Sequence, residues 1–88
     1  MWYVYIVRCQ NNALYTGITQ NVLGRIVKHN SGKGSRSVIA HGLPVKLVYL
    51  EKHENKSSAL KRECAVKKMS KFQKENMIKE NPRGMQNS

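Results

Sequence analysis

The chain has no aspartate, and its only acidic side chains are five glutamates scattered between Glu51 and Glu80. A catalytic site that binds two metal ions requires several clustered carboxylates. The scarcity of acids therefore argues against a two-metal centre. It still allows a single Mg²⁺-like ion that is held by one carboxylate and by water.

Cysteine and histidine are also scarce. The two cysteines, Cys9 and Cys64, form no CxxC pair, and the three histidines lie too far apart in the sequence for a zinc site: His29, His41 and His53. We expect both thiols to be buried and reduced, which suits a cytoplasmic protein.

Long hydrophobic runs are missing as well. No apolar stretch approaches the ~20 residues that a membrane span needs. The chain begins on a predicted strand without a signal-like apolar segment, so we expect neither a membrane anchor nor a secretion signal. With 88 residues, the chain can form one small domain that buries about 60–65% of its unfolded surface.

Positive charge is what the chain has in excess. Sixteen lysines and arginines against five glutamates give a net charge of +11. Such a charge favours a polyanionic partner, most simply nucleic acid. The alternative is a solubilising surface that binds RNA or acidic lipid only nonspecifically.

Hydrophobic periodicity predicts a β-hairpin at the start of the chain. Trp2–Arg8 is apolar or aromatic on both faces, which is typical of a central strand covered on both sides. Leu14–Thr19 follows after a polar turn at Gln10–Asn12, so the two runs can pair as a hairpin.

A helix is predicted after the hairpin, with Gln20 or Asn21 as its N-cap. Arg25 and His29 lie four residues apart and share a face of this helix. Its apolar stripe at helical spacing comprises Val22, Leu23, Ile26 and Val27. The pattern brings a guanidinium and an imidazole near the tyrosine hydroxyls of the hairpin.

The second half of the chain predicts a third strand and two more helices. A glycine- and serine-rich loop covers residues 30–37, and residues 45–51 form the strand. The next helix is capped by Ser57 or Ser58 and carries Glu63. After a break near Ser70, the last helix covers Lys71–Lys79, and its apolar anchors are Phe72, Met77 and Ile78.

The predicted fold class is therefore α+β, with a three-stranded antiparallel sheet flanked by helices. We expect one domain over residues 1–80. Residues 81–88 contain Pro82 and Gly84 and almost no apolar side chain, so we expect them to form a disordered tail.

The two predicted strands of the hairpin resemble the paired half-motifs of the GIY-YIG nuclease domain. Tyr3–Tyr5 is similar to the first half-motif, with Tyr3 in place of its glycine. Tyr15–Gly17 is similar to the second, with Thr16 in place of its isoleucine. The resemblance extends over roughly residues 3–78 and is strongest to the small stand-alone bacterial branch of the family.

The helices continue this resemblance. Arg25 and His29 match the downstream arginine and histidine of the family, and Glu63 matches its metal-binding glutamate. Asn76 is the nearest counterpart of the late asparagine of the family. From spacing alone, Glu63 could instead form a salt bridge with Lys67, and both hairpin tyrosines could be ordinary core aromatics.

The resemblance implies a divalent-metal-dependent endonuclease that hydrolyses DNA and uses one Mg²⁺ or Mn²⁺ ion held by Glu63. Tyr5 would activate the attacking water with the help of His29. Tyr15 would position the water or the phosphate, and Arg25 would neutralise charge on the scissile phosphate. A tyrosine can act as a base only if its pKa falls well below 10, and we expect nearby Arg25 and His29 to lower it.

Five basic residues are candidate contacts to the nucleic acid: Lys28, Lys33, Arg36, Lys67 and Lys71. The small residues of the 30–37 loop would let its backbone approach a phosphate closely. The alternatives are a plain mobile connection for this loop and an ordinary solvated face for the lysines of the last helices.

So small a domain has no added recognition module. We therefore expect a monomer that cleaves single-stranded or branched DNA with low sequence specificity. The main alternative is a catalytically inactive DNA- or RNA-binding accessory protein with the same fold, and a third is a basic structural protein of the nucleoid or ribosome. The intact set of Tyr5, Tyr15, Arg25 and Glu63 favours the enzyme.

Overall fold

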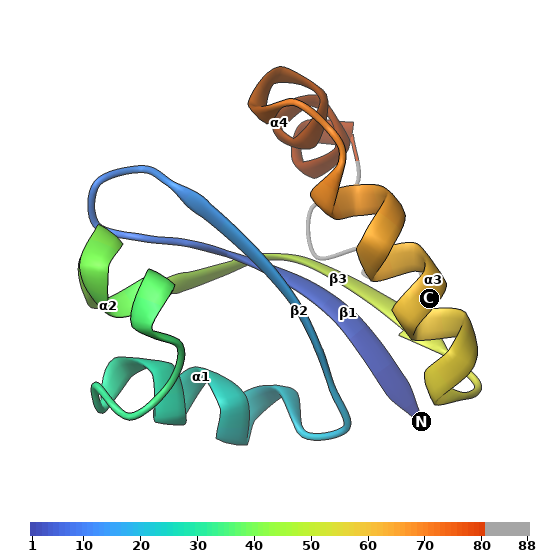
Figure 1. Ribbon diagram of the computed structural model, residues 1–88, viewed down its shortest axis with the longest axis horizontal. Helices are drawn as coiled ribbons and strands as arrows, with labels where there is room; N and C mark the ends of the chain where they lie inside the picture. The colour runs from blue at the N-terminus through green and yellow to red at the C-terminus, as the bar shows by residue number, and fades with distance from the viewer. Residues whose placement is uncertain (81–88) are drawn as a thin grey trace.

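The structure is a computed structural model that describes residues 1–80, so the expected C-terminal tail lies outside the described residues. Its elements follow in the order β1 (Trp2–Arg8), β2 (Leu14–Thr19), α1 (Val22–Asn30), α2 (Arg36–His41), β3 (Lys46–His53), α3 (Lys56–Lys67) and α4 (Lys71–Glu80). The predicted α+β class is confirmed: a three-stranded antiparallel sheet has α1 and α2 on one side and α3 and α4 on the other (Figure 1).

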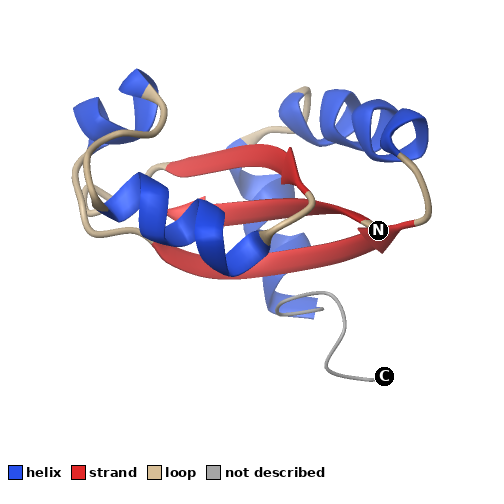
Figure 2. Cartoon of the chain, turned by 90° about the horizontal axis from the view of Figure 1, so that it is seen from below, coloured by secondary structure: helices blue, strands red, loops and turns tan. Residues whose placement is uncertain are grey.

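β1 is the central strand, as its two apolar faces predict. The strand order is β2-β1-β3, and both neighbours run antiparallel to β1. Figure 2 shows the three strands side by side in one twisted layer, with the helices around it. In the register, Tyr5 lies opposite Gly17 of β2 and Leu50 of β3.

Alternating side chains of β1 supply two separate hydrophobic cores. Tyr5 and Val7 point toward α1 and α2, where Val38 is fully buried. Ile6 points the other way and packs with Tyr49 and Val66 under α3 and α4. Because each face is apolar, each can bury its residues against helices, which explains why this strand lies in the middle of the sheet.

The predicted apolar stripe of α1 is wrong in half of its members. The capping prediction is confirmed, because the side chain of Asn21 accepts a hydrogen bond from the Gly24 N–H at 3.0 Å. Ile26 packs against the core, but Leu23 and Val27 are 78% and 68% exposed. Each of the exposed residues lies one position after the inward face, a rotation of about 100° around the helix axis.

Helix α2 was not predicted, because six residues are too few for a helical period to be recognised. The side chain of Ser35 caps it by accepting a hydrogen bond from the Ser37 N–H. The predicted cap of α3 is also wrong. Asn55 caps that helix by accepting a hydrogen bond from the Ser58 N–H at 2.8 Å, so Ser57 and Ser58 lie inside its first turn.

Two expectations about burial are wrong. Cys9 is buried and Cys64 is exposed, although both thiols are free as expected. Phe72 is 74% exposed, whereas Met77 and Ile78 anchor α4 to the core as predicted. Among residues 1–80, no helix is long and apolar enough to cross a membrane.

Candidate active site

Tyr5 lies at the centre of the candidate site. Its ring is buried, and its Oη lies 3.0 Å from Nε2 of His29, which reaches the sheet from α1. Gly17 on the neighbouring strand makes room for this ring. A Cβ atom at Gly17 would lie 2.6 Å from Tyr5 Oη, which is closer than real contacts allow. The glycine of the second half-motif therefore has a steric role.

Tyr15 completes an aromatic cluster with these two residues. It lies on the same face of β2 as Gly17, since successive side chains of a strand alternate between faces. Its ring centroid is 6.5 Å from that of Tyr5 and 5.4 Å from that of His29, which it meets edge-on. The structure thus brings together both predicted tyrosines and the predicted histidine.

His29 is an uncharged, buried imidazole at neutral pH. Only 2% of its surface is exposed, and burial lowers its pKa below the usual 6.5, with further lowering by the charges of Arg25 and Lys28. Its Nδ1 has no hydrogen-bond partner among the described residues. Gly34 lies against this nitrogen, since a Cβ there would be 2.5 Å from Nδ1.

The expected lowering of the Tyr5 pKa is wrong for the free protein. Burial raises this pKa to about 12, and the charges of Tyr15 and Glu63 also raise it. The charge of Arg25 lowers it, but this effect is smaller than that of burial. His29 does not lower the Tyr5 pKa by its charge, because its own imidazole is neutral.

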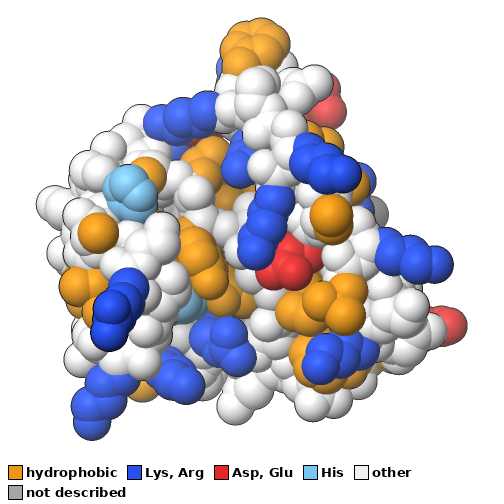
Figure 3. Space-filling model, in the orientation of Figure 1, with side chains coloured by type: hydrophobic (Ala, Val, Ile, Leu, Met, Phe, Trp, Pro, Cys, Tyr) orange, Lys and Arg blue, Asp and Glu red, His pale blue; other side chains and the backbone are white. Residues whose placement is uncertain are grey.

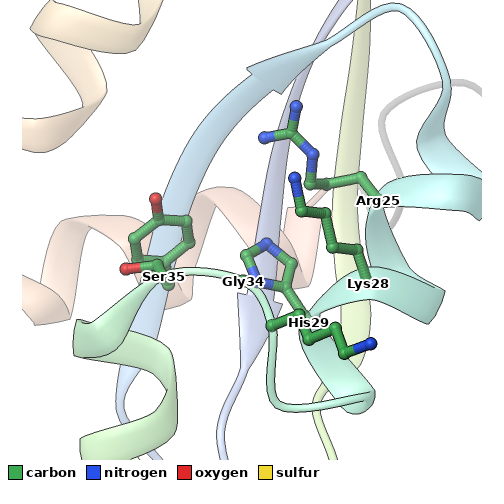
Figure 4. Close-up of a pocket in the computed structure, with 7 residues that line it drawn as sticks. Arg25, Lys28, His29, Gly34 and Ser35 are labelled. Carbon is green, nitrogen blue, oxygen red and sulfur yellow. The ribbon is translucent and has the colours of Figure 1, made fainter.

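A pocket of about 270 Å³ opens beside this aromatic cluster. Tyr15 and His29 form part of its wall, and three cations line it: Arg25, Lys28 and Lys33. Figure 4 shows the side chains of Arg25 and Lys28 rising together from α1, with His29 next to them. A cavity with these cations is suited to a phosphate group.

Glu63 is not one of the residues that line the pocket. Its side chain is 17% exposed on α3, and its Oε2 lies 3.4 Å from Nζ of Lys67, so the salt bridge that the spacing allowed does form. It is nevertheless close enough to Tyr5 for its charge to raise the tyrosine pKa. Among residues 1–80, no group of three or more His, Cys, Asp or Glu side chains could hold a metal ion.

The five predicted basic contacts divide into two groups. Lys28 and Lys33 line the pocket, and Arg36 is exposed at the start of α2, next to its capping residue. Lys67 and Lys71 lie on α3 and α4, where they pair with glutamates four residues away. Figure 3 shows basic side chains spread over the visible face, with few acidic ones among them.

The 30–37 loop was expected to approach a phosphate, but two of its site residues were not singled out. Gly34 and Ser35 also line the pocket, from the loop that precedes α2. The glycine- and serine-rich composition of this loop was the available signal, but composition alone does not show which glycine packs on His29. Asn76 is exposed on α4 and does not line the pocket.

Comparisons with known proteins give a consistent result. The family model described as the GIY-YIG catalytic domain matches residues 1–76. A UPF0213 protein of Syntrophus aciditrophicus is 47% identical over 83 residues, which cover 94% of this chain and 95% of that protein. A UPF0213 protein of Staphylococcus haemolyticus is 50% identical over 78 residues, which cover 89% of this chain and 94% of the relative.

A solved structure is similar over nearly the whole chain. The solution NMR structure of the UPF0213 protein BH0048 from Bacillus halodurans has 36% sequence identity and a TM-score of 0.59. The similarity covers 99% of this chain and 90% of that chain.

Proposed function

Because this chain belongs to the GIY-YIG catalytic-domain family, we propose that it is a divalent-metal-dependent endonuclease that hydrolyses DNA phosphodiester bonds. The observation that carries the proposal is the contact between the buried Tyr5 and His29, which itself forms part of the wall of a pocket lined by three cations. We further propose that the substrate is single-stranded or branched DNA and that cleavage has low sequence specificity.

The pocket would bind the scissile phosphate. Lys28 and Lys33 supply positive charge without fixed geometry, whereas the planar guanidinium of Arg25 can donate two parallel hydrogen bonds to one phosphate. Charge accumulates on this phosphate in the transition state. A hydrogen-bond donor that is already in place therefore stabilises the transition state more than the ground state.

Tyr5 would accept the proton of the attacking water after passing its own proton to His29. The neutral imidazole can accept a proton, and its Nε2 is within hydrogen-bond distance of Tyr5 Oη. In the free protein this transfer is unfavourable, because the pKa of Tyr5 is about 12 and that of His29 is lowered. Neutralising Glu63 would remove one of the charges that raise the Tyr5 pKa.

Glu63 fits a hard divalent cation such as Mg²⁺ or Mn²⁺. It offers carboxylate oxygens at a largely buried position, and such ions accept one carboxylate while water and phosphate oxygens complete the shell. When bound, the ion would supply charge stabilisation at the scissile phosphate. Lys67 would then have to move away from the carboxylate that it now contacts.

The test is to incubate the protein with labelled single-stranded, duplex and forked DNA in the presence of Mg²⁺, Mn²⁺ or EDTA. We expect cleavage with either metal and none with EDTA. Arg25→Ala should lower turnover by on the order of 10²–10³ and affect binding much less. If the wild-type protein binds these DNAs but cleaves none of them with either metal, the enzyme proposal is wrong and the accessory-protein alternative is favoured.

A further inference from the structure

The outward face of α4 presents an aromatic ring to solvent. Phe72, in the first turn, is 74% exposed, although Met77 and Ile78 of the same helix pack into the core. Helical spacing places Asn76 one turn and Lys79 two turns after Phe72 on the same face, and both are exposed. We call Phe72, Asn76 and Lys79 the outer α4 face.

The orientation of this face is fixed by the contacts that other residues of α4 make with the sheet and the core. Arg8 of β1 makes two hydrogen bonds to the Glu75 carboxylate, at 2.8 and 2.7 Å. Together with the packing of Met77 and Ile78, this pair prevents α4 from rotating to bury the ring. The exposure of Phe72 is therefore a consequence of how the helix is anchored.

The surroundings of the ring are basic. Lys68 and Lys71 precede Phe72 by four residues and one residue and are exposed, the side chain of Lys71 by 52%, and Lys79 lies on the same helix face as the ring. Glu75, the acid nearest in sequence, is already paired with Arg8 and Lys71. A second copy of the chain would bring another net charge of +11 to this surface, which opposes self-association and favours a polyanion.

We propose that the outer α4 face stacks an unpaired base of the nucleic acid substrate on Phe72. An aromatic side chain beside lysines is the usual means by which proteins bind single strands, since every base has a π-face. The Asn76 amide can both donate to and accept from the edge of such a base, and Lys79 can contact the adjoining phosphate. This inference rests on the proposed function and specifies that the substrate contains a single-stranded segment.

Duplex DNA offers the ring no partner, because its base faces are already stacked on one another. Binding to a single strand and binding to a blunt duplex should therefore respond differently to a change at Phe72. If a substitution removed only contacts between basic side chains and phosphates, the affinities for the single strand and for the duplex would fall by a similar factor.

The test compares Phe72→Ala, Phe72→Leu and Phe72→Trp with the wild-type protein. Affinity for a labelled oligothymidylate and for a blunt duplex is measured by fluorescence anisotropy in EDTA, so that no cleavage occurs. We expect Phe72→Ala and Phe72→Leu to lose roughly tenfold in affinity for the single strand and almost none for the duplex. Phe72→Trp should retain single-strand affinity, because its ring also stacks.

Phe72→Leu is the matched control for hydrophobicity, since it keeps an apolar side chain but has no ring. Leu23→Ala controls for removing an exposed apolar side chain elsewhere, on α1. The inference is overturned if Phe72→Leu binds the single strand like the wild type, or if both DNAs lose affinity equally. Concentration-dependent dimerisation that is abolished by Phe72→Ala would also overturn it, in favour of a second copy as the occupant.

The outcome is separable from that of the proposed function. A selective loss of single-strand affinity supports the stacking surface even if the wild-type protein cleaves nothing. Conversely, metal-dependent cleavage by a wild-type protein whose Phe72 variants bind normally would refute only the stacking surface.

Discussion

Two glycines determine whether the tyrosine and histidine rings can occupy the site. Gly17 lies under Tyr5 and Gly34 lies against His29, and a Cβ atom at either position would come within 2.6 Å of the ring beside it. Neither glycine has a positive φ angle, so the requirement is for space and not for an unusual backbone conformation. The tyrosine and the histidine are thus positioned partly by two glycines, which have no side-chain functional group.

Gly17→Ala should displace the Tyr5 ring. We expect it to lower the free energy of unfolding by about 1–3 kcal/mol, as overpacking of a core does, and to abolish cleavage. Thermal unfolding and cleavage assays measure the two effects. Tyr5→Phe in the same background removes the closest atom of the clash, so the double variant should be more stable than the sum of the two single changes predicts. If the stability changes of the two single variants simply add in the double variant, the methyl group of Ala at position 17 does not contact the ring at position 5.

The lowered pKa of His29 predicts a loss of stability in mild acid. The unfolded chain takes up a proton near pH 6.5, whereas the folded protein resists protonation at this residue until lower pH. The unfolded state therefore binds more protons in this window, and the stability that the neutral ring provides is lost as the pH falls below about 6.5. Melting temperatures measured between pH 7.5 and 5 should show this decline.

His29→Gln should flatten that decline, because glutamine does not titrate. His41→Gln, at an exposed position, is the control and should keep the wild-type slope. A wild-type slope in His29→Gln would assign the effect to other groups.

Glu63→Gln separates a metal-binding role from a salt bridge. The change keeps the size of the side chain but removes the charge that a hard cation requires. If Glu63 holds the metal, cleavage should vanish while the circular dichroism spectrum persists and DNA affinity is kept or increased. If Glu63 only pairs with Lys67, the change should cost a few tenths of a kcal/mol and leave cleavage nearly intact. Glu54→Gln, at an exposed position, controls for the loss of one negative charge.

At the scale of elements, the sequence predicts the strands better than the helix faces. β1 was placed correctly because each of its faces is apolar. The inward face of α1 was placed incorrectly. The sequence offers four apolar residues on adjoining faces of this helix, and it cannot show that a buried histidine lies on the face that meets the sheet. The same limit applies to Phe72: hydrophobicity predicts burial, but the Arg8–Glu75 pair fixes how α4 is rotated. That pair joins residues 67 positions apart, which no local pattern reveals.

The Arg8–Glu75 pair should anchor α4 to the sheet. Both side chains are partly exposed, at 26% and 34%, so Glu75→Gln should cost at most about 1 kcal/mol of global stability. Its larger effect should be local: amide hydrogen exchange should accelerate within α4 but not in β1. Glu80→Gln makes the same chemical change at an exposed position at the end of the same helix and serves as the control. Unchanged exchange in α4 of Glu75→Gln would mean that apolar packing alone holds the helix.

At the scale of the whole molecule, the positive charge is left largely uncompensated. Of the five glutamates, Glu51, Glu63 and Glu75 are each paired with a basic side chain within the protein. Each of these pairs neutralises one basic side chain, which still leaves the chain with a large excess of lysine and arginine. Long-range attraction of a polyanion follows from this excess.

Binding of DNA should therefore weaken steeply as salt is added. Each phosphate that the protein neutralises contributes about −0.7 to the slope of log affinity against log salt concentration for a single strand. Lys33→Ala should reduce the magnitude of this slope by about one such contact, whereas Phe72→Ala should leave the slope unchanged. Anisotropy titrations at several salt concentrations measure both, and an affinity that is independent of salt would contradict the assignment of a polyanionic partner.

The central position of β1 also constrains the order in which the chain can fold. One edge of β1 pairs with residues 14–19, but the other must wait for residues 46–53. An isolated two-stranded hairpin is marginally stable at best, so the first 30 residues can bring Tyr5 near His29 only transiently during synthesis. The third strand then stabilises the sheet, and α3 adds the glutamate after that. A nascent chain therefore cannot hold the complete set of reactive groups until α3 has been made.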